Sequence, residues 1–279
     1  MIDTKLVSGI SFILVFVIVI FGLSTSGMHK IATIANSGGY VDLPVIMYHS
    51  VGEKTGKYVI SPEMLEEDFK LINRQGYKTI TSADLIAFKE QGVPLPEKPV
   101  ILTFDDGYFN NYTYAFDLLK KYDMKAVISV VGKFSEDYNN SSAPLNNNYS
   151  HLTYSMIKEM NASGLLEFAN HSYNMHNMEN RRGILKKKGE NSEQYKENLT
   201  QDVTKCNDIL KNECGIMPVA FTYPFGCVNK ESSGIINSLG FKVTYGCEEG
   251  INRITQEHDL KELKRYNRAD TTDISTILK

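Results

Sequence analysis

The stretch that decides the fold is VILTFDDGY, residues 100–108. A short apolar run that ends at a turn is typical of a β-strand. Here the run ends in two adjacent carboxylates, Asp105 and Asp106, followed by Gly107. Asp-Gly is a common turn dipeptide, so the pair read alone fits a turn as well as an active site.

Outward from this stretch, short apolar runs alternate with helical patterns. The predicted strands are residues 44–48, 78–81, 99–104, 125–131, 165–170, 218–223 and 241–245. Helices are expected to start at Ser61-Pro62 and at Thr81, and to cover residues 153–161 and 191–213. Strands that alternate with helices favour an α/β fold with a mainly parallel sheet. Six or seven such units can close into a barrel, and a doubly wound open sheet is the alternative.

Residues 6–23 read LVSGISFILVFVIVIFGL, without a charged residue. A membrane-spanning helix needs about 20 apolar residues, whereas a signal-peptide core has about 7–15. We therefore predict a transmembrane anchor within residues 1–23, with a cleaved signal segment as the alternative. Residues 24–42 read as a stalk and residues 43–279 as one catalytic domain. Both alternatives place that domain outside the cytoplasm, either on the cell membrane or secreted.

Composition narrows the class of protein further. A formal net charge of −3 gives no broad electrostatic reason to bind nucleic acid. The four cysteines form no C-x-x-C pair, which argues against a cysteine zinc site. Cys206 and Cys214 lie too far apart along one predicted helix to bridge, so free buried thiols are favoured. Tryptophan is absent, so any surface that stacks on sugars must come from Tyr and Phe.

Four predicted strands end in reactive residues. These ends are MYH at residues 47–49, TFDDG at 103–107, ANHS at 169–172 and TYPFG at 222–226. Active sites of barrels and open α/β sheets form at the carboxyl ends of strands. We therefore expect the four ends to converge on one pocket.

His171 and His176 are the candidate partners of the aspartate pair. Their spacing does not place both on one helical face, but they can converge if His171 ends a strand and His176 lies in the loop beyond. Two histidines and one carboxylate leave open positions on a metal ion, as in catalytic sites. The second carboxylate could then accept a proton from the attacking water.

The segments TFDDGY (103–108), HSYNMH (171–176) and YPFG (223–226) together resemble the polysaccharide deacetylases with the NodB homology domain, carbohydrate esterase family 4. The resemblance spans about residues 42–268. It implies a distorted (β/α) barrel and metal-dependent removal of N-acetyl groups from a hexosamine polymer of the cell envelope or the exterior. It assigns the roles of general base to Asp105, metal ligands to Asp106, His171 and His176, and oxyanion stabilisation to the backbone N–H of Phe225. The arginine that often opens the third motif is absent.

The general acid has two candidates, His49 and His258. His49 ends a predicted strand, whereas His258 lies in a charged stretch, so His49 is favoured. It resembles the family branch with this motif at the front, as in poly-N-acetylglucosamine deacetylases. Arg265 and Arg268 resemble a tail segment of that branch and receive no role. Zinc is the expected metal, with cobalt, nickel or iron as alternatives. The alternative functions are an O-acetyl esterase of the xylan type and a non-catalytic polysaccharide-binding domain.

Overall fold

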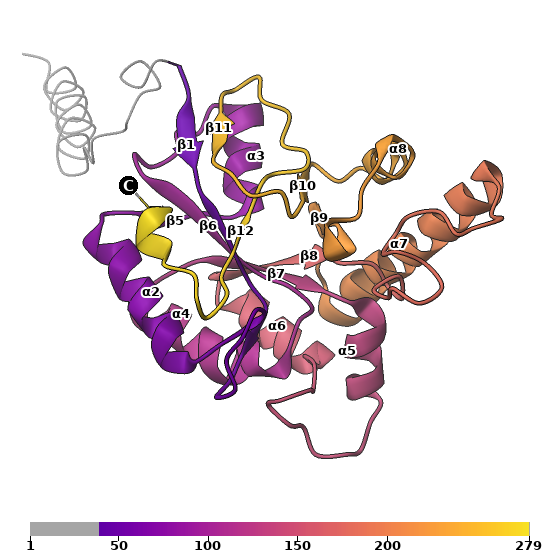
Figure 1. The fold of residues 1–279 in the computed structure, drawn as a ribbon, viewed down its shortest axis with the longest axis horizontal. Helices are drawn as coiled ribbons and strands as arrows, with labels where there is room; N and C mark the ends of the chain where they lie inside the picture. Colours follow the sequence, from indigo (N-terminus) through magenta and orange to yellow (C-terminus); the bar gives the residue numbers. More distant parts are fainter. Residues whose placement is uncertain (1–38, 279) are drawn as a thin grey trace, which may run out of the picture.

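The computed structural model describes residues 39–278 and shows a parallel sheet flanked by helices (Figure 1). The predicted anchor or signal segment, residues 1–23, and residues 24–38 of the predicted stalk lie outside the described residues. Within residues 39–278, no helix combines the length and the apolar character that crossing a membrane requires.

Eight strands of the described chain form the parallel sheet, in the order β10-β9-β8-β7-β6-β2-β12, with β5 beside β6. Their bounds are β2 Val45–Tyr48, β5 Lys78–Thr79, β6 Pro99–Phe104, β7 Ala126–Val130, β8 Leu166–Asn170, β9 Ala220–Thr222, β10 Val243–Tyr245 and β12 Tyr266–Asn267. All seven predicted strands are confirmed, with ends that differ by up to two residues. Among the eight strands of this sheet, only β12 was not predicted.

The sheet is curled. β12 pairs with β2 at one edge, while Leu263, just before β12, bridges to Tyr245 of β10 at the other edge. The two edges of the sheet therefore approach each other through one short segment. This curled parallel sheet agrees with the α/β prediction. Two small pairs lie outside it: β1 (Val41–Leu43) with β11 (Asn252–Ile254), and β3 (Ser50–Val51) with β4 (Val59–Ile60).

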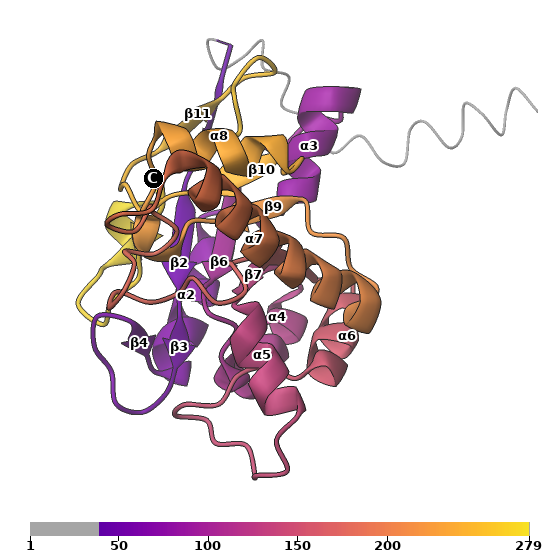
Figure 2. The ribbon, with the colours of Figure 1, turned by 90° about the vertical axis from the view of Figure 1, so that its right-hand side faces the viewer.

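Seven α-helices of the described chain pack around the sheet, most of them on its outer face. They are α2 Pro62–Arg74, α3 Ser82–Gln91, α4 Phe116–Tyr122, α5 Gly132–Asn139, α6 Tyr154–Ala162, α7 Ser192–Cys214 and α8 Lys230–Ser238. The four helices predicted individually, α2, α3, α6 and α7, are confirmed. The Ser61 hydroxyl caps α2 by accepting from Met64 N at 3.2 Å, as its sequence indicates. In Figure 2, α5, α6 and α7 pack against one another on one flank of the sheet.

Alternation along the strands gives the sheet two buried faces. Ile46, Leu102 and Ile128 pack outward into the core beneath α2, α4 and α6. Val45, Ile101 and Val127 face the other way, into a second core shared with α3 and the segment before β12. Because successive side chains of a strand point to opposite faces, burial of both faces explains why the strands read as continuous apolar runs. All four cysteines are free thiols, and only Cys247 is not fully buried.

Candidate active site

The inner face of the sheet becomes polar toward the carboxyl ends of the strands. The alternation that points Val45 and Ile101 inward also brings His49 and Asp105 to the same face, four residues further on. A cavity of about 470 Å³ opens there. It is lined by Met47, His49, Lys57, Tyr58, Asp105, Asp106, Tyr108, His171, His176, Phe225, Cys247, Glu249 and Asn267. All six site residues predicted from the sequence are among them, whereas His258 is not.

Asp106 is turned toward the histidines by a sharp bend. Its φ is +71° and that of Gly107 is +67°, both in the left-handed region. A side chain at Gly107 would place its Cβ 2.9 Å from Val130 Cγ1, so only glycine fits this turn. Asp-Gly is thus a turn and part of the site at once, and the two interpretations of the sequence do not compete. A non-glycine residue held at positive φ beside a cavity is typical of functional sites.

Asp106, His171 and His176 form a group that can hold a metal ion. Their ligand atoms lie within 4.8 Å of one another. Asp106 Oδ1 is 3.1 Å from His176 Nε2 and 3.5 Å from His171 Nε2, and this buried oxygen has no hydrogen-bond partner among the described residues. One carboxylate oxygen and two imidazole nitrogens suit a divalent transition metal. The residues therefore fit the metal ion that the sequence predicts.

His171 is held in the orientation that a ligand needs. Its Nδ1 lies 2.8 Å from the carbonyl oxygen of Thr222, on the neighbouring strand β9. If Nδ1 donates there, Nε2 carries the free lone pair that faces Asp106. Burial alone would raise the pKa of the Asp106 carboxyl, but the imidazoles of His171 and His176 beside it outweigh burial and hold that pKa well below its usual value. Asp106 is therefore an anion in this site.

Asp105 forms a buried ion pair with Arg265, an arginine for which the sequence indicated no role. Arg265 Nη1 and Nη2 donate to the two oxygens of Asp105, each at 2.8 Å, and Arg265 Nε donates to the Gly246 carbonyl at 2.7 Å. This two-pronged pair is fully buried on the arginine side. Burial would raise the pKa of Asp105, but Arg265 and His171 outweigh it and lower that pKa. Arg265 thus fixes the orientation of Asp105, although no arginine opens the third motif.

His49 lies at the end of β2, and its ring is 4.7 Å from that of Tyr58. Its Nδ1 is buried and has no hydrogen-bond partner among the described residues. Burial lowers the pKa of His49, and the opposing charges of Asp105 and Asp106 do not restore it. His49 is therefore mostly neutral at pH 7 and must take up a proton before it can act as an acid.

Phe225 lies in the short 3₁₀ turn Pro224–Gly226 with φ +58°, again in the left-handed region. The turn itself uses the N–H groups of Gly226 and Cys227, which donate to Tyr223 O and Pro224 O. The Phe225 ring is 44% exposed and lies 4.3 Å from the His176 ring. Tyr58, 48% exposed, is a second exposed ring on the cavity wall. Its position in the turn just before β4 left no signal in the sequence.

A family model described as polysaccharide deacetylase matches residues 92–244, more than half of the chain. The chain is 25% identical over 232 residues to the poly-beta-1,6-N-acetyl-D-glucosamine N-deacetylase of Escherichia coli strain K12, which covers 76% of this chain but 34% of that protein. It is 25% identical over 206 residues to the protein of the same name from Staphylococcus aureus strain MRSA252, covering 73% of this chain and 66% of that one. This chain therefore spans less than two thirds of each of these two relatives.

A similar solved structure is that of a de-N-acetylase from Aggregatibacter actinomycetemcomitans. It superposes with a TM-score of 0.74 at 26% identity, over 85% of this chain and 98% of that one. The fold, the order of the motifs and the match to the family model lead to one conclusion. The chain belongs to the polysaccharide deacetylase family.

Proposed function

We propose that this chain is a metal-dependent hydrolase that removes N-acetyl groups from the N-acetylhexosamine units of an extracytoplasmic polysaccharide. The observation that carries the proposal is one cavity in which a ligand group for a divalent metal ion lies beside a second, separately anchored carboxylate. Two relatives are named as N-deacetylases of poly-β-1,6-N-acetylglucosamine, which makes that polymer the first substrate to test.

Asp106, His171 and His176 would hold the ion, and zinc suits such a set, with cobalt, nickel or iron as alternatives. When bound, the ion supplies Lewis acidity toward the acetamide carbonyl and the attacking water. The rest of the chemistry falls to the protein. Asp105, ionised and held at both oxygens by Arg265, accepts a proton from the water as it attacks the carbonyl carbon.

The Phe225 N–H donates to the oxygen on which negative charge develops. His49, once protonated, gives its proton to the sugar nitrogen as the carbon–nitrogen bond breaks. The products are acetate and a free amine. The exposed rings of Tyr58 and Phe225 are placed to stack on sugar rings, the role left to Tyr and Phe by the absence of tryptophan.

The test is acetate release from a panel of polymers, with metal content measured on the same sample. Poly-β-1,6-N-acetylglucosamine, chitin oligomers, peptidoglycan and acetylated xylan separate N-deacetylation from ester hydrolysis. We expect release from an N-acetylglucosamine polymer and a fall of about 10³-fold in Asp105→Asn, with metal content unchanged. Release from acetylated xylan alone would establish the esterase instead, and binding without any release would establish the non-catalytic alternative.

We further propose that residues 1–23 tether residues 43–279 to the outer side of the cell membrane. The uncharged run at residues 6–23 supports this arrangement. Fractionation of cells that express the full chain tests it. A chain found in the medium and shortened at its N-terminus would establish the cleaved signal instead.

A further inference from the structure

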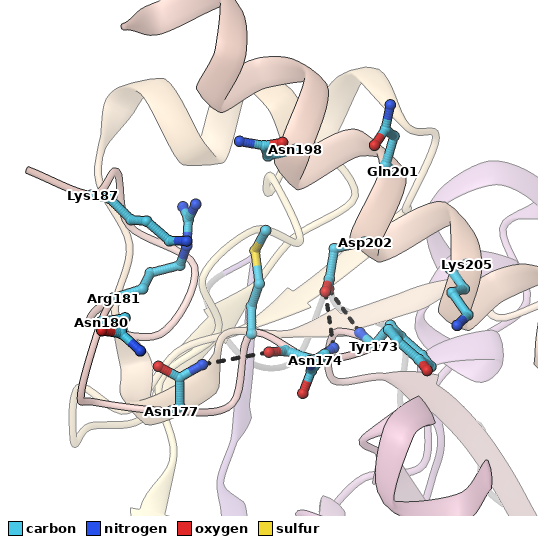
Figure 3. Close-up of a pocket in the computed structure, with 11 residues that line it drawn as sticks. Tyr173, Asn174, Asn177, Asn180, Arg181, Lys187, Asn198, Gln201, Asp202 and Lys205 are labelled. Carbon is cyan, nitrogen blue, oxygen red and sulfur yellow. Dashed lines mark hydrogen bonds between the residues drawn. The ribbon is translucent and has the colours of Figure 1, made fainter. Parts of the chain in front are cut away.

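A second cavity, of about 460 Å³, lies between helix α7 and the loop that follows β8 (Figure 3). One wall is that loop and its continuation, from Tyr173 to Lys187, and the other is α7 at Asn198, Gln201 and Lys205. Tyr173, Asn174 and Met175 fall between His171 and His176 in the sequence. The same few residues therefore form a wall of the second cavity and join the two metal ligands.

Carboxamides dominate the lining of this second cavity. Five of them face it: Asn174, Asn177, Asn180, Asn198 and Gln201. Each carboxamide offers both donors and an acceptor, which matches the mixed hydroxyl and acetamide groups of a sugar. Asn177 Oδ1 is buried and has no hydrogen-bond partner among the described residues. The side chain of Asn180 makes no hydrogen bond to any other described residue, so its full capacity is open to a ligand.

The charged groups in the lining are mostly paired with protein groups. Arg181 Nη2 lies 2.8 Å from Glu190 Oε1, and both side chains are buried. Asp202 accepts the backbone N–H groups of Tyr173 and Asn174 at 2.8 and 2.9 Å. Among the described residues, Lys187 Nζ has no ion-pair partner. An unpaired ammonium would repel the free amines of a deacetylated polymer, so the lining favours uncharged sugars.

On these grounds we propose that the second cavity is a distal subsite that binds an uncharged, still acetylated sugar of the polysaccharide. The assignment of the ligand rests on the proposed function. Asp202 ties the wall of the cavity to the backbone between the two histidines, so a sugar bound there is held at a fixed offset from the metal site. A polymer that fills both sites gains affinity because its second contact is intramolecular.

Two variants test the subsite. Asn180→Ala removes a side chain with no protein partner, and Gln201→Trp places a bulky ring in the cavity from α7. The matched control is Asn212→Ala, an exposed carboxamide of α7 outside the cavity. KM and kcat are measured on N-acetylglucosamine oligomers of two and of eight sugars. We expect both test variants to raise KM about fivefold or more for the long oligomer alone, with kcat unchanged, the loss of about one hydrogen bond.

Equal KM values for the long oligomer in the control and both test variants would overturn the subsite. If the wild-type chain deacetylates no polymer, the proposed function fails and the subsite is tested separately. Equilibrium binding of the eight-sugar oligomer is then compared between Asp105→Asn and Asp105→Asn combined with Gln201→Trp. Weaker binding in the combined variant supports the subsite, and equal binding overturns it.

Discussion

Two buried arginine–aspartate pairs flank the short strand β12, and only one of them reaches the cavity of the proposed active site. Arg265 holds Asp105 at 2.8 and 2.8 Å on the inner side of the sheet. Arg268 holds Asp68 of α2 at 2.7 and 3.0 Å. Each pair also involves a hydroxyl, since Thr103 Oγ1 accepts from Arg265 Nη1 and Tyr48 OH donates to Asp68. The hydrogen-bond distances alone therefore do not show which of the two pairs takes part in catalysis.

The surroundings of the two carboxylates make the difference. Asp105 lines the cavity, and Arg265 with His171 lowers its pKa despite burial. Asp68 lies outside the cavity, and there burial outweighs Arg268 and raises the pKa. In the proposed mechanism, the pairing with Arg265 keeps Asp105 ionised and able to accept a proton. The pairing of Asp68 with Arg268 instead links α2 to the segment just after β12. Four substitutions test this division of roles.

The largest effect is expected from Arg268→Met. It leaves Asp68 buried without its partner, and breaking a buried ion pair costs about 3–5 kcal/mol of stability. Denaturant unfolding measures the loss, while kcat of the folded protein should stay within about twofold of wild type. Adding Asp68→Leu should restore part of the stability, because no unpaired charge then remains. A large fall in kcat would place this pair in the active site after all.

Arg265→Met is expected to lower kcat about 10²-fold, the cost of misplacing a general base. Without the guanidinium, burial raises the pKa of Asp105. Since the base must be ionised, the acid limb of the pH–rate profile should move to higher pH. Metal content should not change, because Asp106 and the histidines remain. An unshifted acid limb would mean that Arg265 only supports the fold.

Thr103→Val tests the hydroxyl beside the active-site pair. Thr103 Oγ1 accepts from Arg265 Nη1 at 3.1 Å and donates to Ile46 O at 3.1 Å. Valine keeps the shape but leaves an arginine N–H unpaired, so Arg265 should hold Asp105 less firmly. We expect kcat to fall about tenfold, with the acid limb shifted in the same direction as in Arg265→Met but by less. Unchanged kcat would show that Arg265 needs no help from this hydroxyl.

Tyr48→Phe is the matching change at the other pair and the smallest effect. It removes the 3.2 Å hydrogen bond to Asp68 and keeps the ring stacked on Phe104. The free energy of unfolding should fall by about 1 kcal/mol. Initial rates of acetate release measured below the unfolding transition should equal those of wild type. A rate change larger than that of Thr103→Val would reverse the roles assigned to the two hydroxyls.

The sequence predicted most of the sheet and six residues of the cavity for a simple physical reason. Strands buried on both faces, such as Pro99–Phe104, are long apolar runs, and the chemistry follows where each run ends. Because successive side chains of a strand point to opposite faces, Asp105 then lies on the inner face of the sheet. The left-handed turn that points Asp106 toward the histidines is also recognisable in the sequence, because a glycine, Gly107, must follow Asp106.

The role of Arg265 could not be predicted in the same way. Strand β12 is only Tyr266–Asn267, and the residues around it are charged or polar, so no apolar run marks it. Which arginine faces the cavity depends on the register of that strand against β2, and a shift of one residue would turn each side chain to the other face. Tyr58 and the second cavity also leave no signal in the sequence, because both depend on how loops fold against the rest of the protein.

The pairing of β12 with β2 also has a consequence for the timing of biosynthesis. Arg265 follows Asp105 by 160 residues. At a synthesis rate of about 5–20 residues per second, Arg265 is therefore added roughly 8–30 s after Asp105. During that interval, a chain that already carries Asp105, Asp106, His171 and His176 still has no guanidinium to orient its base. Hydrolytic competence would then arise only after Arg265 has been synthesised. Until that point, a nascent chain of the proposed hydrolase would be inactive.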